Sequence, residues 1–107
     1  MKVEIYHYDR EIVNNKIIYK TTPTYIGYAE VDKFDTYEIF NLCNWICWTS
    51  KKPSNLHGEI VCCDHGLLLI NPETQEYWLS KSFGWLVGTK DIIDTYVDNN
   101  KNRAIWT

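Results

Sequence analysis

Cysteine and histidine are the side chains here that could hold a metal ion. Cys43 and Cys47 stand four residues apart in a helical pattern, and Cys62, Cys63 and His65 follow in one short segment. Structural zinc sites are usually built from Cys-x2–4-Cys pairs on tight knuckles. A helical pair beside two adjacent strand residues fits that pattern poorly, because successive strand residues point to opposite faces. We therefore expect metal-free thiols and no cofactor, with a zinc site made by this set as the alternative.

The thiols are expected to act as small hydrophobic side chains. Cys43 and Cys47 lie on the apolar stripe of a predicted helix, and Cys63 shares strand parity with Val61. These three cysteines should be buried and reduced. Cys62 should point away from Val61 and should be the first thiol to react with an alkylating reagent.

A cysteine nucleophile paired with a histidine is the enzymatic alternative. Cys47 or Cys63 would need His57 or His65 beside it as an oriented base. The sequence offers no third group to orient that base and no recognisable oxyanion hole. Asp64-His65-Gly66 is typical of a bend. We expect the chain not to be an enzyme.

Aromatic residues are the best candidates for a binding surface. They make up 15% of the 107 residues, and a core of this size cannot enclose them all. In strands where Ile, Leu and Val occupy one face, the interleaved aromatics fall on the other, and exposed aromatics with polar neighbours are typical of protein interfaces. The predicted interface residues are Tyr6, Tyr8, Tyr28, Trp45, Trp48, Trp78 and Trp85. The alternatives are cross-strand aromatic pairing on a solvated face and stacking on single-stranded nucleic acid.

Charge and hydropathy limit the partners. The formal net charge is −3, and the eleven basic residues are scattered rather than gathered on one face. Phosphate recognition needs clustered positive charge, so we do not expect nucleic-acid binding. No segment approaches the ~18 apolar residues of a membrane span, and the N-terminus lacks a signal-peptide pattern. We expect a cytoplasmic protein that does not bind membranes.

The elements that position these residues are one main helix and a sheet. The segment DTYEIFNLCNWICW, residues 35–48, has Asp35 as its N-cap and Glu38 three residues later. Ile39, Leu42, Cys43 and Ile46 then form its apolar stripe. The apolar sheet surface expected to receive that stripe consists of Val3, Ile5, Ile26, Val61, Leu68, Ile70 and Leu86.

Period-two alternation and turn residues predict the strands. Asn14-Asn15 marks a hairpin turn, and residues 54–58 are expected to be a loop. Thr89 can cap a short helix over 90–97, and Ile105 and Trp106 can dock an otherwise polar tail. The predicted strands cover residues 2–8, 12–13, 17–19, 25–31, 59–63, 67–70, 76–80 and 83–87. The expected fold is therefore a single α+β domain spanning 1–107, a mostly antiparallel sheet of five or six strands with the main helix on one face.

The order of these elements is similar to small YodL-like proteins of phages and mobile elements. The helix segment EIFNLCN (38–44) resembles the family's helix motif, with Ile39, Phe40 and Asn44 in place. IVCCDHGLLLI (60–70) corresponds to its Ser/Gly/Asp strand, and EYWLSKSFGWLV (76–87) corresponds to its closing hairpin. Cys62, Cys63, Asp64, His65 and Gly66 stand where that family has serines and a Gly-Asp pair. The resemblance covers about residues 25–87 and implies a fold and a mobile-element origin, since the family has no assigned activity.

These observations lead to one expected function and one alternative. We expect a small interaction protein, encoded by a phage or other mobile element, that binds a host protein and inhibits or redirects it, for example a component of a defence system. The alternative is a domain that sequesters a small molecule or nucleotide in an aromatic-lined pocket. Surplus aromatics and exposed sheet edges also favour a homodimer.

Overall fold

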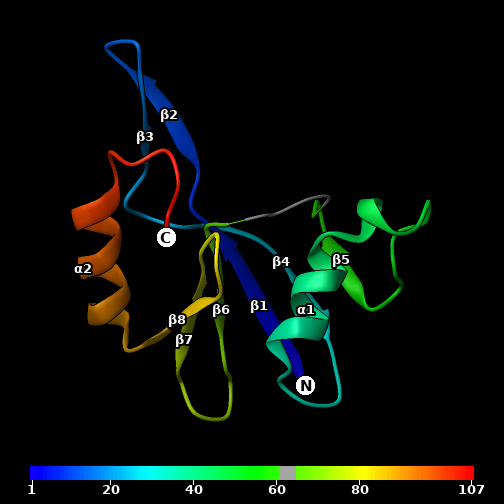
Figure 1. Cartoon of the computed structure of the whole chain (residues 1–107). Helices are drawn as coiled ribbons and strands as arrows, with labels where there is room; N and C mark the ends of the chain where they lie inside the picture. The colour runs from blue at the N-terminus through cyan, green and yellow to red at the C-terminus, as the bar shows by residue number, and fades with distance from the viewer. Residues whose placement is uncertain (61–64) are drawn as a thin grey trace.

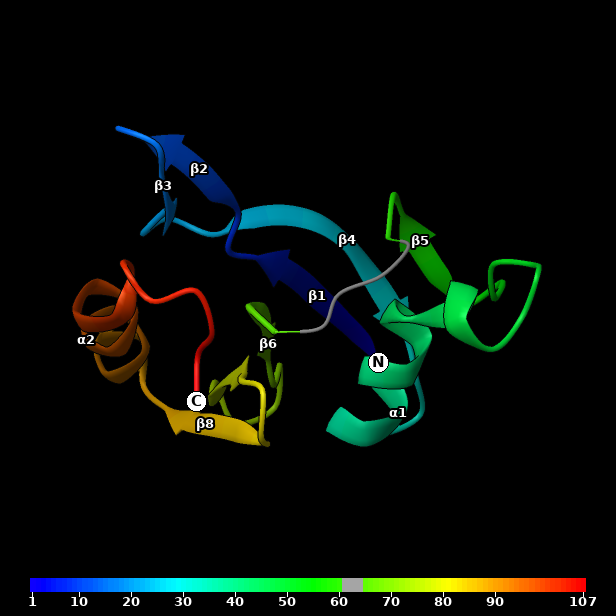
Figure 2. The ribbon, with the colours of Figure 1, turned by 45° about the horizontal axis from the view of Figure 1, so that its top comes forward.

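The fold is a six-stranded antiparallel sheet with a helix on each face (Figures 1 and 2). The structure is a computed structural model that describes residues 1–60 and 65–107. Within these residues the sheet order is β5-β4-β1-β6-β7-β8, and every neighbouring pair is antiparallel. The strands are β1 (Lys2–His7), β4 (Thr24–Glu30), β5 (Leu56–Gly58), β6 (Leu67–Ile70), β7 (Tyr77–Ser80) and β8 (Trp85–Gly88). The predicted α+β class is therefore confirmed.

A second, two-stranded sheet is formed by β2 (Arg10–Val13) and β3 (Lys16–Tyr19). The predicted turn joins them, because Asn14 and Asn15 have φ values of 52° and 63°. Asparagine tolerates this left-handed region better than most residues, and two such residues in succession make the tight type I′ turn of a hairpin.

Alternation along the central strands builds two separate cores. Val3 and Ile5 of β1 and Leu67 and Leu69 of β6 pack beneath α1 (Thr36–Cys43). Leu68 lies on the other side of β6, with the buried face of α2 (Lys90–Asn100). The apolar run of β6 is therefore buried on both faces, as its position in the middle of the sheet requires.

This alternation corrects part of the predicted helix-facing surface. Leu68 belongs to the α2 side, because its strand neighbours Leu67 and Leu69 face α1, and Leu86 packs against the same core as Leu68. Ile70 lines a surface hollow on that same second side. Val61 lies outside the described residues.

The main helix is shorter than predicted. Asp35 is its N-cap, and its carboxylate accepts hydrogen bonds from the backbone N–H groups of Tyr37 and Glu38. The α-helix ends at Cys43, and Asn44 has φ −111° and ψ 33° while its side-chain amide donates to the Phe40 carbonyl. A 3-10 turn, η1 (Trp45–Cys47), follows. An asparagine that hydrogen-bonds the backbone locally competes with helix continuation, and this break places Ile46 and Cys47 in solvent rather than on the stripe.

The C-terminal region is more ordered than predicted. Thr89 caps α2 by accepting from the Ile92 backbone, and the helix runs on to Asn100. Trp106 is completely buried, whereas Ile105 stays 56% exposed, so only one of the two predicted anchors docks. The indole N–H of Trp106 donates to the Asn100 carbonyl at 3.1 Å, which satisfies the polar atom of this buried ring.

Two further differences concern the chain between the helix and β6. Residues 54–58 were expected to be a loop, yet Leu56–Gly58 forms edge strand β5. Most of the predicted strand over 59–63 lies outside the described residues. No helix in the described ranges is long and apolar enough to cross a membrane.

Candidate functional site

The sheet face opposite α1 is only partly covered, and tyrosines gather on the uncovered part. Strand register places Tyr28 opposite Glu4, Tyr25 opposite Tyr6, and Tyr77 opposite Ile70. Helix α2 covers the β7–β8 end of this side. We call the remaining surface the open face; it consists of Lys2, Glu4, Tyr6, Tyr25, Tyr28, Ile70 and Tyr77.

A β-bulge in β4 brings two of these tyrosines to the same side. Tyr25 and Tyr28 are three residues apart, so regular alternation would place them on opposite faces. The register between β1 and β4 shifts between Ile5 and Tyr6, and this inserts one extra residue into β4. Tyr25 then reaches the Tyr6 ring in an edge-on contact with a centroid distance of 5.5 Å.

Gly27 makes this bulge possible. Its φ is +148°, and a Cβ there would overlap the backbone carbonyl of His57 on the neighbouring strand. Only glycine combines that torsion with so close an approach of β5.

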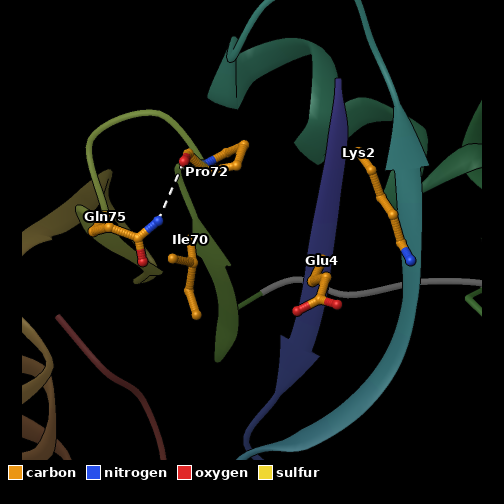
Figure 3. A pocket seen from close by; sticks show the side chains of 5 residues that line it. All are labelled: Lys2, Glu4, Ile70, Pro72 and Gln75. Carbon is orange, nitrogen blue, oxygen red and sulfur yellow. Dashed lines mark hydrogen bonds between the residues drawn. The ribbon is translucent and has the colours of Figure 1, made fainter.

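Three hollows follow one another along the open face. The first, of about 230 Å³, lies between Lys2 and Glu4 of β1 and the β6–β7 turn, where Gln75 donates to the Pro72 carbonyl (Figure 3). The second, of about 200 Å³, lies beside Tyr6 and Tyr77. The third, of about 260 Å³, continues to the first turn of α2 and residues 21–23. Successive hollows share lining residues, so together they form one shallow groove along β6.

Electrostatics keep the Tyr6 hydroxyl on this face neutral. The hydroxyl donates to Glu4 Oε2 at 3.0 Å, and partial burial together with this carboxylate raises the pKa of Tyr6 above its ordinary value. A raised pKa favours the protonated form. Tyr6 therefore serves as a hydrogen-bond donor and a flat apolar surface, not as a nucleophile.

Tyr28 is held between a cation and an imidazole. The Lys2 ammonium lies 4.5 Å from the centre of the Tyr28 ring, and the His57 ring stacks on it with a centroid distance of 4.6 Å. Glu30 approaches His57 Nε2 at 3.6 Å, beyond hydrogen-bond range. These contacts restrain the orientation of the Tyr28 ring.

The predicted interface residues separate into different locations. Tyr6 and Tyr28 lie on the open face. Tyr8 is a correction: it is 1% exposed because its ring packs on Trp106, with centroids 5.6 Å apart. Burial also raises its pKa.

The tryptophans lie elsewhere. Trp78 and Trp85 contact each other at 6.2 Å between ring centres and pack against the core beneath α1. The prediction assumed a single buried sheet face, whereas here both faces carry a helix and Trp78 takes the side opposite Leu79. Trp45 is half-buried against the same core. Trp48 is 57% exposed at the end of the 3-10 turn η1, and its indole donates to the Asn41 carbonyl.

Sequence reasoning did not include Tyr77 among the interface residues. It lies on the side of Leu79, packs partly against the core beneath α2, and also lines the groove. The glycine inside the apolar strand pattern YIGY was the available signal for the bulge, because an isolated strand glycine often marks one.

The candidate metal and nucleophile residues are not assembled in the described ranges. Cys43 is buried in the α1 core, and Cys47 is exposed, which contradicts the predicted burial of that thiol. The His65 ring contacts the Tyr19 hydroxyl and the Trp106 ring. No group of three His, Cys, Asp or Glu side chains that could hold a metal occurs in residues 1–60 and 65–107. Cys62 and Cys63 lie outside the described residues.

Comparisons with protein-family models, with curated proteins and with solved structures found no match to this chain.

Proposed function

We propose that this chain is a non-enzymatic binding protein that docks a partner protein on its open face. The observation that carries the proposal is the grouping of Tyr6, Tyr25, Tyr28 and Tyr77 on one face of the sheet, where Tyr6 and Tyr77 line a groove. Tyrosine is enriched at protein interfaces, because it offers a large contact area and a hydroxyl at a small cost in conformational entropy. Tyr25, at 48% exposed, has the most surface left to bury.

The size of the hollows favours a protein over a small molecule. Each of the three measures between about 200 and 260 Å³, whereas pockets that enclose small ligands usually measure ~300–1,000 Å³. A row of shallow hollows suits several side chains of a protein partner better than one enclosed ligand. The alternative of a small-molecule-sequestering domain is therefore the less favoured of the two.

We also propose a finer role for the protein. Its sequence is rich in Ile, Lys, Asn and Tyr, which are the residues that AT-rich genes encode most often. This composition and the YodL-like order of elements support a protein of a phage or mobile element in a low-GC bacterium. In that setting the partner would be a host protein of the cytosol, such as a defence component, which binding would inhibit or redirect.

A capture experiment with a matched control tests the binding face. The immobilised protein is incubated with lysate of a low-GC bacterium, and the retained proteins are identified by mass spectrometry. Tyr25→Ala should reduce recovery of a stoichiometric partner at least about tenfold, as expected for an interface anchor. Tyr37→Ala, which removes a 77% exposed tyrosine from α1 on the other side of the sheet, should leave recovery unchanged.

Two outcomes would contradict the proposal. If Tyr25→Ala and Tyr37→Ala bound the partner equally well, the open face would not be the binding surface. If the protein carried a stoichiometric small molecule and retained no partner, the sequestering alternative would replace it.

A further inference from the structure

The β2–β3 hairpin is a second exposed feature, independent of the open face. It extends away from the main sheet and both helices (Figures 1 and 2). Ile12 and Ile17 face each other across the hairpin and are 76% and 53% exposed. An exposed apolar pair on a projecting hairpin needs a covering surface, because apolar patches of this kind mark association sites.

The turn geometry determines which backbone groups point outward. In a two-residue hairpin the pair that flanks the turn, here Val13 and Lys16, is hydrogen-bonded, and the next pair is not. The N–H and C=O groups of Ile12 and Ile17 therefore point away from the hairpin. Tyr19, two residues beyond Ile17, follows the same rule, since its N–H points outward and donates to the Lys101 carbonyl at 2.8 Å.

The two edges of the hairpin differ. The C-terminal tail occupies the β3 edge at its root through that Tyr19–Lys101 bond. Along the β2 edge, the part of the chain that the structure describes gives the outward groups of Ile12 no backbone partner. An unpaired strand edge is a template for another strand, so β2 is the edge available for pairing.

We propose that a second copy of this chain pairs with β2, antiparallel and about a two-fold axis at Ile12. In this arrangement the Ile12 N–H of each copy donates to the Ile12 carbonyl of the other, and the two hairpins become one four-stranded sheet. The Ile12 and Ile17 side chains of both copies then lie side by side on one face. The contact is closed and isologous, as two-fold dimers require.

Charge selects this register over the competing ones. The nearest competing antiparallel register that uses outward groups pairs Ile12 with Arg10 and places Glu11 directly opposite Glu11 of the second copy, and the next one places Arg10 opposite Arg10. Both set like charges against each other, which is unfavourable. With the axis at Ile12, Glu11 lies opposite Val13. Lys16 of one copy is then two strands, or about 10 Å, from Glu11 of the other, a gap that these two long side chains together can span.

Sedimentation equilibrium over a wide concentration range tests the dimer. Wild-type protein should pass from the 12.7 kDa monomer to twice that mass as concentration rises. Ile12→Pro removes the outward N–H but no bond within the hairpin, because proline is tolerated at an edge position of this kind. This variant should raise the dimer dissociation constant at least about tenfold, since both reciprocal bonds are lost.

Tyr37→Ala is the control, because it removes a side chain of about the same exposure, 77%, from α1, outside the proposed dimer contact. It should leave the dissociation constant within about threefold of wild type, which is less than 1 kcal/mol. Near-ultraviolet circular dichroism of both variants verifies that they remain folded. A wild type that stays monomeric at every concentration, or a control that dissociates as readily as Ile12→Pro, would overturn the proposal. Neither result bears on partner capture by Tyr25, so the two proposals fail separately.

Discussion

The two faces of the main sheet are built from the same strands but are covered differently. Beneath α1 the packing is continuous from β5 to β6 and includes the fully buried Val3, Ile5 and Ile39. On the opposite face, α2 and the C-terminal tail enclose only the β6–β8 end, around Trp106. The rest of this face carries tyrosines, the charged side chains of Lys2 and Glu4, and the shallow groove. Both faces therefore carry a buried core that holds the fold, and we place binding on the part of the second face that this core leaves uncovered.

Truncating the buried side chain of the C-terminal tail should lower the free energy of unfolding as much as truncating a buried residue of a helix. Trp106 packs against Tyr8, Tyr19 and Tyr96. Trp106→Ala should lower the free energy of unfolding by about 3–5 kcal/mol, as for other buried aromatic truncations. Urea unfolding measures this change. Ile105→Ala, at the exposed neighbouring position, is the control and should cost less than about 0.5 kcal/mol. Equal effects would mean that the tail does not dock through its indole.

The bulge at Gly27 should be nearly as sensitive. Gly27→Ala adds a Cβ that overlaps the His57 carbonyl and imposes an unfavourable φ, so we expect a loss of about 3 kcal/mol or more. Gly84→Ala separates the effect of the Cβ overlap from the effect of the unfavourable φ. Gly84 also has a positive φ, of 89°, but its Cβ would meet no atom within 4 Å, so this variant should cost only about 1 kcal/mol. Thermal or urea unfolding measures the loss of stability in both variants. Equal losses would show that the close approach of β5 to Gly27 adds nothing to the cost of the substitution.

The sequence predicts a structural feature well when its physical cause acts between residues that are close together in the chain. The Asp35 cap, the Asn14-Asn15 turn and the Thr89 cap act within a few residues, and all three are present in the structure. The side taken by Trp78 depends on tertiary packing. Periodicity shows that two faces differ, but it does not show which face meets which helix.

The candidate site was predictable only in part, for the same reason. Tyr6 was correctly placed opposite the inward-facing Val3 and Ile5, because β1 alternates regularly over these residues. Tyr25 shares that surface only through the bulge, and Tyr77 lines the groove while it packs partly against the core beneath α2. Both depend on contacts between segments far apart in the sequence.

The α1 side can be probed at a residue of intermediate burial. Phe40 is half-buried and meets Trp85 edge-on with ring centres 6.0 Å apart. Phe40→Ala should cost about 2 kcal/mol, less than a fully buried aromatic truncation, because part of the ring is already in water. Tyr37→Ala, on the exposed side of α1, should cost less than about 0.5 kcal/mol. A larger effect at Tyr37 than at Phe40 would reverse the assigned orientation of the helix. Neither change should affect binding at the open face.

The smallest expected effect concerns Asp9, which joins the main sheet to the hairpin. Its carboxylate accepts a hydrogen bond from the Thr24 hydroxyl at 2.8 Å and lies 3.2 Å from His7 Nδ1. The Thr24 bond, followed by that of His7, holds the pKa of Asp9 below its ordinary value. A carboxyl whose pKa is lower in the folded than in the unfolded state stabilises the fold above the unfolded pKa, and this stabilisation is lost as pH falls through the folded pKa.

Asp9→Asn should therefore be less stable than wild type at neutral pH, and the difference should shrink as pH falls below about 4. Urea unfolding across a pH series measures how the free energy of unfolding of the wild type and of the variant changes with pH. Asp98→Asn, a surface carboxylate paired with Lys101 on α2, controls for the general effect of removing one negative charge. If the difference at Asp9 stayed constant with pH, its contribution would come from backbone geometry at the hairpin root and not from the carboxylate.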